Sequence, residues 1–398
     1  MSALASLQGE AAVQMKKPNE SWRTWHVLRA ANEERRRRER LPGAQPPLET
    51  KSAGLQAPDA KPRLPRPPAD VPTPKMEIKR GSRRKPFLYI RPPANFSLRA
   101  NYEQVASFFT HLRYQIYRDK IPTELPRAVA FEAFKHASPS AALVLAAELY
   151  RWQQFLGKKL RIIRHSLWDP GIDALFRSLG LFDFLETPDM PVVRAQPQHP
   201  QLQMLKYRTD TDVVGAKCDD LLEHLAEISG PIHADNFIYD GLIEALKNSK
   251  QHAYSEPDVW FGVPAGTWFM SGSYDRSSKS LTAAVYDMGV GIPHTLPRAT
   301  IWEGVRGILT TITSSVGGKS DDAQMIMAAM EYGRTRTMIQ GRGNGLPTMM
   351  RILDHHRGYL RIISGTGEAI YDSLTGRIST TNHRVALGGT LIEWSITK

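Results

Sequence analysis

Two polar side chains lie four residues apart in a segment with helical apolar spacing. They are Glu244 and Asn248, in GLIEALKNSKQH at 241–252. Residues at this spacing share one face of a helix. A carboxylate there can serve as a general base toward an attacking water or hydroxyl, and an amide oxygen can bind Mg²⁺, which prefers oxygen ligands. Taken alone, the pattern is common on helices and usually marks only a solvated edge.

A second feature joins an apolar run to a glycine-containing turn. The segment LTAAVYDMGVGIP at 281–293 predicts a buried strand that ends at Asp287. An aspartate in that place can accept a hydrogen bond from an exocyclic amine such as that of adenine. Gly289 and Gly291 permit close approach of the backbone to a ligand, although a plain glycine-rich turn gives the same pattern.

A third glycine cluster precedes a helical run. Gly341, Gly343 and Gly345 alternate with other residues, and Arg342 adds a cation. Glycine-rich backbone that leads into a helix N-terminus forms an anion site, because free N–H groups face the phosphates. Further on, Thr390 follows two glycines and begins a terminal strand, where its hydroxyl is expected to hydrogen-bond near a bound base.

The stretch between the second and third features contains two arginines that could contact a ligand. It contains a helical run at 321–332, followed by Arg334 and Arg336. A fixed guanidinium can stabilise phosphate charge, so these arginines are candidates for contact with a terminal phosphate. The alternative is that both are simply solvated.

Two other patterns predict no site. Gly317-Gly318-Lys319-Ser320 lacks the earlier glycine that a P-loop requires, since Thr313 stands in its place. His355 and His356 are adjacent in sequence, so on a helix they point about 100° apart.

The elements that must position these residues alternate along the chain. Between 86 and 190, strand patterns and helix patterns follow one another, which indicates an α/β layer structure. The expected strands are 86–93, 127–134 and 159–165, and the expected helices are 101–118, 138–157 and 169–186. Residues 191–213 are expected to be a connection that contains one strand.

Composition is that of a folded protein with one basic arm. The 398 residues are 41% hydrophobic, with no apolar run long enough for a membrane helix and no secretory signal pattern at the start. Residues 1–94 hold 20 Lys and Arg against 9 Asp and Glu, whereas the remainder holds 32 against 31. Cys218 is the only cysteine, which excludes an intramolecular disulfide and fits a reducing cytoplasm.

The order of these features resembles the GHKL superfamily of gyrase-, heat-shock-chaperone-, histidine-kinase- and MutL-like ATPases. The resemblance covers 235–398 and implies a mixed sheet covered by helices, an α+β sandwich, that binds ATP with Mg²⁺. It implies that Glu244 is the base, Asn248 the magnesium ligand and Asp287 the adenine contact. Gly289 and Gly291 would form the adenine pocket, and the glycines at 341, 343 and 345 would surround the phosphates. The segment between Gly291 and Gly341 would be a mobile cover over ATP, with Arg334 and Arg336 reaching the terminal phosphate when it closes. His224 lacks the flanking residues of a phosphoacceptor histidine and is expected on a helix surface.

Residues 86–190 resemble a STAS-like domain, the fold of anti-sigma-factor antagonists. In that family a serine at the start of a helix accepts phosphate from a partner GHKL kinase. The matching positions are Ser138 and Ser140. The alternative is that these serines cap the helix by accepting its free N–H groups.

These features predict four parts: a disordered, Pro-rich arm at 1–85, a STAS-like domain at 86–190, a connector and helix at 191–234, and the ATP-binding domain at 235–398. The function expected is that of a cytoplasmic regulatory ATPase or anti-sigma-type serine/threonine kinase. The alternative is a nucleotide-switched binding module with little catalysis. Expected partners are ATP, a regulatory protein and a second copy of the chain, but no membrane. Nucleic acid is a further candidate at the arm, where ERRRRER could contact phosphates or only aid solubility.

Overall fold

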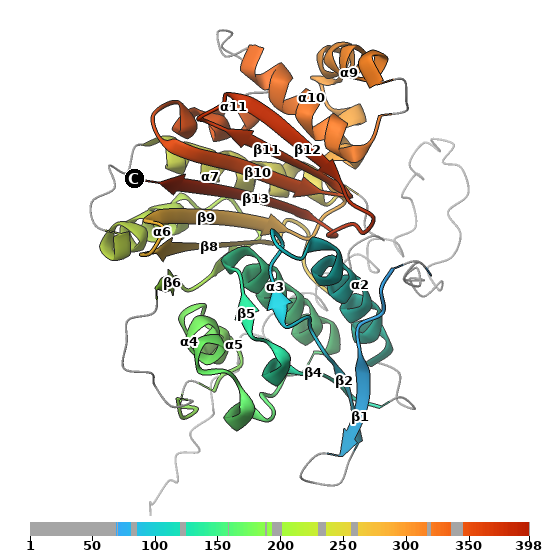
Figure 1. Ribbon diagram of the computed structural model, residues 1–398, viewed down its shortest axis with the longest axis vertical. Helices are drawn as coiled ribbons and strands as arrows, with labels where there is room; N and C mark the ends of the chain where they lie inside the picture. The colour runs from blue at the N-terminus through green and yellow to red at the C-terminus, as the bar shows by residue number, and fades with distance from the viewer. Residues whose placement is uncertain are drawn as a thin grey trace, which may run out of the picture. The chain divides into compact units, whose positions relative to one another are not determined.

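The computed structural model describes residues 69, 71–80, 86–119, 125–157, 159–187, 189–192, 201–229, 236–255, 262–316, 320–335 and 345–397. Most of the predicted arm lies outside these residues. The described residues from Val71 onward belong to one compact unit. They form a mixed α/β structure with helices and several sheets (Figure 1).

An eight-stranded sheet runs through the centre of this unit. Its strand order is β12-β11-β10-β13-β9-β8-β6, and β7 also pairs with β8. The strands are β6 Leu202–Met204, β7 Arg208–Asp210, β8 Trp268–Asp275, β9 Ser280–Asp287, β10 Arg357–Ser364, β11 Gly367–Asp372, β12 Arg377–Asn382 and β13 Thr390–Thr397.

The pairings of this sheet correct one expectation. Every pairing among its described strands is antiparallel, whereas the resemblance to GHKL domains implied a mixed sheet. The reason is that β8–β9 and β10–β11–β12 are successive strands joined by short turns, and such connections make antiparallel pairs. β7 and β6 come from the predicted connector, which therefore supplies two strands to the sheet where one was expected.

Helices cover both faces of the sheet, and each face has its own hydrophobic core (Figure 1). On one face lie α6 Gly215–Ser229, α7 Asn236–Asn248 and α11 Gly345–Met350. Trp268, Val285 and Trp394 pack beneath them. On the other face lie α2 Tyr102–Asp119 and α3 Pro139–Leu156. Their core includes Phe269 and Tyr286 of the same strands, because successive residues of a strand face opposite sides.

The helices between 86 and 190 form largely where the sequence predicts them. In α2 the four apolar positions Val105, Phe108, Leu112 and Ile116 are fully buried, as their spacing indicates. α3 begins with a proline in its first turn and ends at Gly157, which adopts a left-handed conformation with φ 62°. The last predicted helix is divided into α4 Pro170–Ser178 and α5 Leu181–Phe184.

The strands of this region depart from the prediction. β1 Met76–Arg80 pairs with β2 Pro86–Ile90, which pairs in parallel with β4 Arg127–Val129. The predicted arm is therefore too long, because its last residues pair in this sheet. β3 Asn95–Phe96 and β5 His136–Ala137 form a separate short pair.

The predicted strand at 159–165 is absent from the structure. Residues 159–164 have no regular structure, and a 3₁₀ turn follows at His165–Leu167. Leu160 and Ile162 pack on the large core, while Ile163 packs on a small cluster around Tyr89. Apolar side chains on both sides of the backbone are thus covered without strand pairing, which explains why the alternating pattern misled the prediction.

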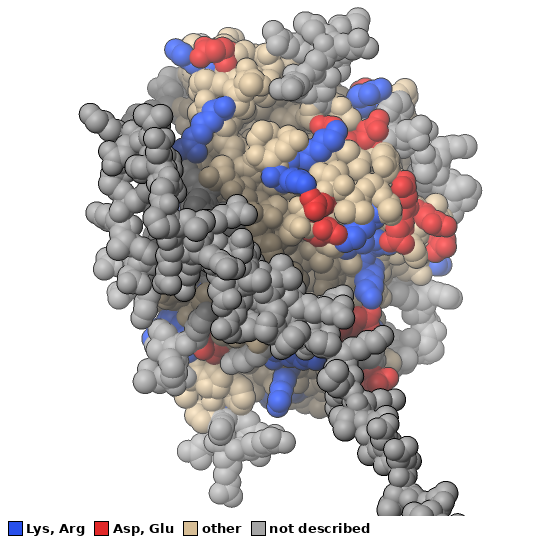
Figure 2. Space-filling model, turned by 180° about the vertical axis from the view of Figure 1, so that it is seen from behind, with Lys and Arg blue, Asp and Glu red and all other residues tan. Residues whose placement is uncertain are grey.

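The stretch between β9 and β10 is helical. It contains α8 Ile292–Thr295, α9 Trp302–Val316 and α10 Asp322–Thr335, the last of which matches the predicted helix at 321–332. α9 and α10 pack together around a small core, to which α9 contributes Val305 and Leu309 and the preceding turn contributes Leu296. Basic and acidic side chains alternate over the visible described surface (Figure 2), in line with the near-neutral composition of residues 95–398.

Candidate functional site

Helix α7 presents Glu244 and Asn248 at the edge of its buried face. Leu242 and Leu246 are fully buried against the sheet, which fixes the rotation of the helix. The two polar side chains are partly exposed. Glu244 accepts a hydrogen bond of 2.6 Å from Lys247 through Oε1. No described residue is a hydrogen-bond partner of the Asn248 side chain, which leaves its amide available to a ligand.

The first residue of α11 lies beside both of these side chains. A Cβ atom added to Gly345 would stand 3.5 Å from Nδ2 of Asn248 and 3.5 Å from Oε2 of Glu244. The structure therefore brings together the helix motif and the last glycine of the third motif, about a hundred residues apart in sequence. Gly341, Arg342 and Gly343 lie outside the described residues.

Asp287 ends strand β9 and is buried, with 5% of its surface exposed. Its Oδ1 accepts a hydrogen bond of 2.9 Å from the amide of Gly289, and its Oδ2 accepts one of 3.3 Å from the hydroxyl of Ser249. Thr390, its register partner on β13, also lowers the pKa of this carboxyl group through its backbone amide. Burial raises the pKa of Asp287 to about 6, while these hydrogen bonds act in the opposite direction.

The turn after β9 is attached to the end of α7. The helix continues as a π-helical turn, Ser249–Ala253, a feature frequently found at functional sites. Besides the bond from Ser249 to Asp287, the amide of Val290 donates to the carbonyl of Ala253 at 2.7 Å. Gly289 lies so close to Ala253 that any side chain would overlap its carbonyl group.

Gly291 and Thr390 both lie next to the side chain of Ser364. Gly291 has φ 94°, a conformation that favours glycine. A Cβ atom at Gly291 would lie 2.9 Å from Oγ of Ser364. The hydroxyl of Ser364 accepts a hydrogen bond from the amide of Ile292 at 2.7 Å and lies 2.9 Å from the hydroxyl of Thr390. The ends of β9, β10 and β13 are therefore joined by polar contacts.

The described arginine of the predicted cover has partners of its own. Nη1 of Arg334 donates to both carboxylate oxygens of Glu331, at 3.0 and 3.2 Å, and the guanidinium lies 5.5 Å from the ring centre of Tyr371. Its neighbour Gly333 packs on Pro347, where an added Cβ would meet the ring at 2.8 Å. The C-terminus of α10 thus lies against α11. Arg336 is outside the described residues.

The two candidate phosphoacceptor serines differ in their surroundings. Ser140 is buried, with 4% of its surface exposed, and its hydroxyl donates to Oε2 of Glu393 on the central strand β13. Ser138 is partly exposed at the start of α3. Its side chain makes no capping hydrogen bond, so the alternative role as a side-chain cap does not hold for it. Of these two serines, Ser138 is the one that solvent can reach.

The remaining sequence candidates are placed as follows. His224 lies half-exposed on α6, where Nδ1 is 2.7 Å from the carbonyl oxygen of Asp220, as expected for a helix-surface residue. The described residues contain no cluster of three or more His, Cys, Asp or Glu side chains that could hold a metal ion. The segment with the incomplete P-loop pattern lies mostly outside the described residues.

Two residues of the site were not predicted from the sequence. Ser249 contacts Asp287, and Ser364 contacts Thr390 and Ile292. Ser249 directly follows Asn248, and a hydroxyl at the end of a motif helix could have been a signal. Ser364 had none, because its role depends on β10 lying next to β13 in the sheet.

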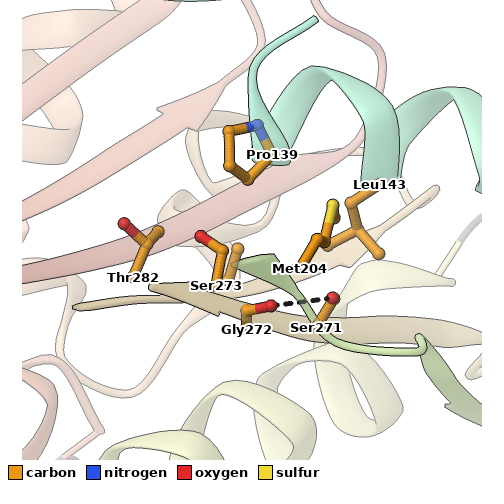
Figure 3. Close-up of a pocket in the computed structure, with 8 residues that line it drawn as sticks. Pro139, Leu143, Met204, Ser271, Gly272, Ser273 and Thr282 are labelled. Atoms are coloured by element: carbon orange, nitrogen blue, oxygen red, sulfur yellow. Dashed lines mark hydrogen bonds between the residues drawn. The ribbon is translucent and has the colours of Figure 1, made fainter. Parts of the chain in front are cut away.

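A small pocket lies elsewhere, between the start of α3 and the sheet (Figure 3). Pro139 and Leu143 face Ser271, Ser273 and Thr282 across it. It is on the opposite face of the sheet from α7. Ser271 pairs with Ala284 of the α3 core, and Ser273 and Thr282, two positions further along the same strands, lie on the same face.

Comparisons with protein-family models, curated proteins and solved structures found no match to this chain. None of the helices in the described part of the chain combines the length and hydrophobicity that crossing a bilayer requires.

Proposed function

We propose that this protein binds ATP with Mg²⁺ through a GHKL-type site in residues 235–398 and acts as a regulatory ATPase or serine/threonine protein kinase. One observation carries the proposal: motifs from distant parts of the chain meet at one end of the sheet. Ser249, next to Asn248, donates to Asp287. Asp287 stands opposite Thr390 in the sheet. Gly345 lies beside the side chains of Glu244 and Asn248, since a Cβ atom added to it would stand 3.5 Å from each.

The base would be recognised by Asp287. Its carboxylate already accepts hydrogen bonds from uncharged donors, and a further N–H donor such as an exocyclic amine matches an acceptor-only group. The close packing of Gly289 on Ala253 and the turn at Gly291 set the backbone around this carboxylate. Thr390 supplies a hydroxyl directly beside it in the sheet.

The phosphate end would lie at Glu244, Asn248 and Gly345. Asn248 fits a magnesium ligand because its amide is free of described partners and lies beside the glycine that opens α11. With few protein ligands nearby, Mg²⁺ would be held largely by phosphate oxygens, as is usual for this ion. When bound, it would neutralise charge on the phosphates. Glu244 would take the proton from the attacking water or hydroxyl.

The partner relations follow from the same proposal. A STAS-like role for residues 86–190 would make Ser138 the phosphoacceptor, because Ser140 is buried against Glu393. The expected cytoplasmic location and a regulatory protein partner belong to this proposal as well. The alternative, a nucleotide switch without catalysis, differs from it only in turnover.

The test is a comparison of nucleotide binding and turnover in purified variants. We expect Asp287→Asn to weaken ATP binding at least about tenfold, since a charged hydrogen-bond partner is lost. Asp275→Asn, on the same pair of strands but at the opposite end, is the matched control, because Asp275 stands opposite Ser280. Glu244→Ala should retain binding and lose turnover, with Glu223→Ala on α6 as its control.

Each result has one reading. Binding that depends on Asp287, with turnover that depends on Glu244, supports the proposed enzyme. Binding without turnover in the wild type supports the nucleotide switch. Absence of ATP binding by the wild-type protein would refute both.

A further inference from the structure

The α2–α3 layer reaches across the sheet to the turn that precedes Thr390. This turn contains Gly388 and Gly389, with φ 79° and 113°. Its second glycine packs so closely on the carbonyl of Asp287 that a side chain would overlap it. The turn therefore sits directly against the backbone of the proposed base-binding residue.

The carbonyl of Gly388 is held from the side of the helices. The hydroxyl of Tyr286 donates to it at 2.6 Å, and Nη2 of Arg113 lies at 3.4 Å. A side chain at Gly388 would overlap the guanidinium of Arg113. Tyr286 is the residue before Asp287 in β9, so the two side chains project from opposite faces of the same strand.

A buried carboxylate fixes this pair of donors. Glu148 of α3 is fully buried. Its Oε1 accepts hydrogen bonds from Nε and Nη2 of Arg113 at 2.9 and 2.8 Å, and the hydroxyl of Tyr286 lies 3.4 Å from the same atom. Two charge-assisted hydrogen bonds to one carboxylate oxygen hold the guanidinium firmly in place. Arg113 comes from α2, so both helices hold the turn.

We propose that Arg113 and Tyr286 are positioning residues that fix the Gly388–Gly389 turn, and through it the donor geometry around Asp287, so that the α2–α3 layer controls how well the site recognises adenine. The inference rests on the proposed ATP site. Arg113 and Tyr286 lie on the face of the sheet opposite Asp287, so they would affect adenine recognition without touching the nucleotide.

The test uses the full-length protein and two conservative variants. Tyr286→Phe removes only the hydroxyl, and Arg113→Lys keeps the charge opposite Glu148 but loses the fork of donors. Tyr274→Phe is the control, because Tyr274 is a strand tyrosine on the neighbouring β8 whose hydroxyl has no hydrogen bond to a described residue. It is partly buried, whereas Tyr286 is fully buried. Affinities are measured for ATP and for ITP, which lacks the exocyclic amine.

We expect Tyr286→Phe and Arg113→Lys to lower the preference for ATP over ITP by about fivefold, the equivalent of one hydrogen bond. A general loss of stability would weaken both nucleotides equally and leave this ratio unchanged. Without nucleotide, hydrogen exchange of the amides at 387–390 should accelerate in these variants but not in Tyr274→Phe.

Two outcomes would overturn the inference separately from the proposed function. If the wild type prefers ATP and the variants keep its full preference, the positioning role is wrong and the ATP site stands. Unchanged hydrogen exchange in the turn would also refute the role. If the wild type shows no ATP binding, the proposed function fails, and the control of adenine recognition fails with it.

Discussion

Asp287 is a buried carboxyl group whose described hydrogen-bond donors are uncharged. Its pKa is raised to about 6 by burial, so the native protein holds this proton more tightly than the unfolded chain does. Below the unfolded pKa both states are protonated and the group has no effect. As the pH rises toward 6, the unfolded state loses its proton first, so stability falls, and the penalty persists above pH 6.

This gives a pH-dependent prediction for Asp287→Asn. The variant should be more stable than the wild type at pH 8, by at most about 2 to 3 kcal/mol for a shift of about two units, and the difference should vanish near pH 3. Denaturant titrations at both pH values measure it. Equal stability of the two proteins at pH 8 would contradict the raised pKa. Greater stability with lost nucleotide binding is the expected signature of a functional residue.

Gly289 supports a second prediction at a single residue. Gly289→Ala should lower the free energy of unfolding by about 1 to 3 kcal/mol, because the new methyl group overlaps backbone atoms of Ala253. Gly307→Ala is the control: Gly307 is in the interior of α9, and among the described residues no atom outside its own helical turn lies within 4 Å of an added Cβ. That substitution should be neutral or stabilising by up to roughly 1 kcal/mol. Thermal melts of both variants decide the matter, and a Gly289→Ala protein as stable as wild type would be inconsistent with this packing.

Among individual residues, the sequence indicated chemistry but not contact partners. The spacing of Glu244 and Asn248 was enough to place both on one face of α7. The burial of Asp287 followed from the apolar run before it. The contacts of Ser249 and Ser364 could not be predicted, because they depend on the π-helical turn and on strand order. Both arise from tertiary packing rather than from local preference.

Among the secondary-structure elements, α3 joins the N-terminal layer to the central strand of the sheet. Its first turn places Ser140 against Glu393 of β13, while Ser138, two residues earlier, stays partly exposed. The same short segment thus presents one serine to the core and one to solvent.

A pair of substitutions tests this arrangement. Ser140→Asp should destabilise the protein by about 3 kcal/mol or more, because it buries a second carboxylate beside Glu393. Ser138→Asp should be tolerated within about 0.5 kcal/mol, since an aspartate suits the start of a helix. Chemical denaturation of the two variants gives both numbers. Equal losses at the two positions would show that the contact with Glu393 is unimportant.

Helices were easier to predict than strands for a physical reason. The apolar spacing in α2 and α3 is long and regular, and each helix satisfies its own backbone hydrogen bonds. A strand needs a partner, and residues 159–164 have none in the structure although their side chains alternate suitably. Sheet order was beyond reach, because β13 is inserted between β9 and β10.

For the whole molecule, the central fact is that the helices of the first half and the sheet of the second half share one hydrophobic core. Phe269, Tyr286 and Leu391 belong to strands of the predicted ATP-binding domain, yet they are buried in the core formed with α2 and α3. The predicted boundary near residue 190 lies within this compact unit. The helices of residues 86–190 cover apolar side chains that would otherwise face water.

A truncation follows from this shared core. Residues 201–398 produced alone should bind a hydrophobic dye, aggregate, or unfold without a sharp transition, because one face of the sheet is uncovered. A version that begins at residue 69 and keeps α2 and α3 is the control and should melt cooperatively. A soluble 201–398 fragment with a single sharp transition would show that the shorter piece is an independent folding unit.

The place of β13 in the sheet also bears on how the protein is made. This strand comes after all the others in the chain, but it lies between β9 and β10 and pairs with both along its whole length. During synthesis, the earlier strands leave the ribosome as two groups with nothing to join them. Until β13 is available, the edges of β9 and β10 that pair with it are unpaired. Assembly must therefore follow release of residues 390–397, and a nascent chain stalled before them should depend on chaperones.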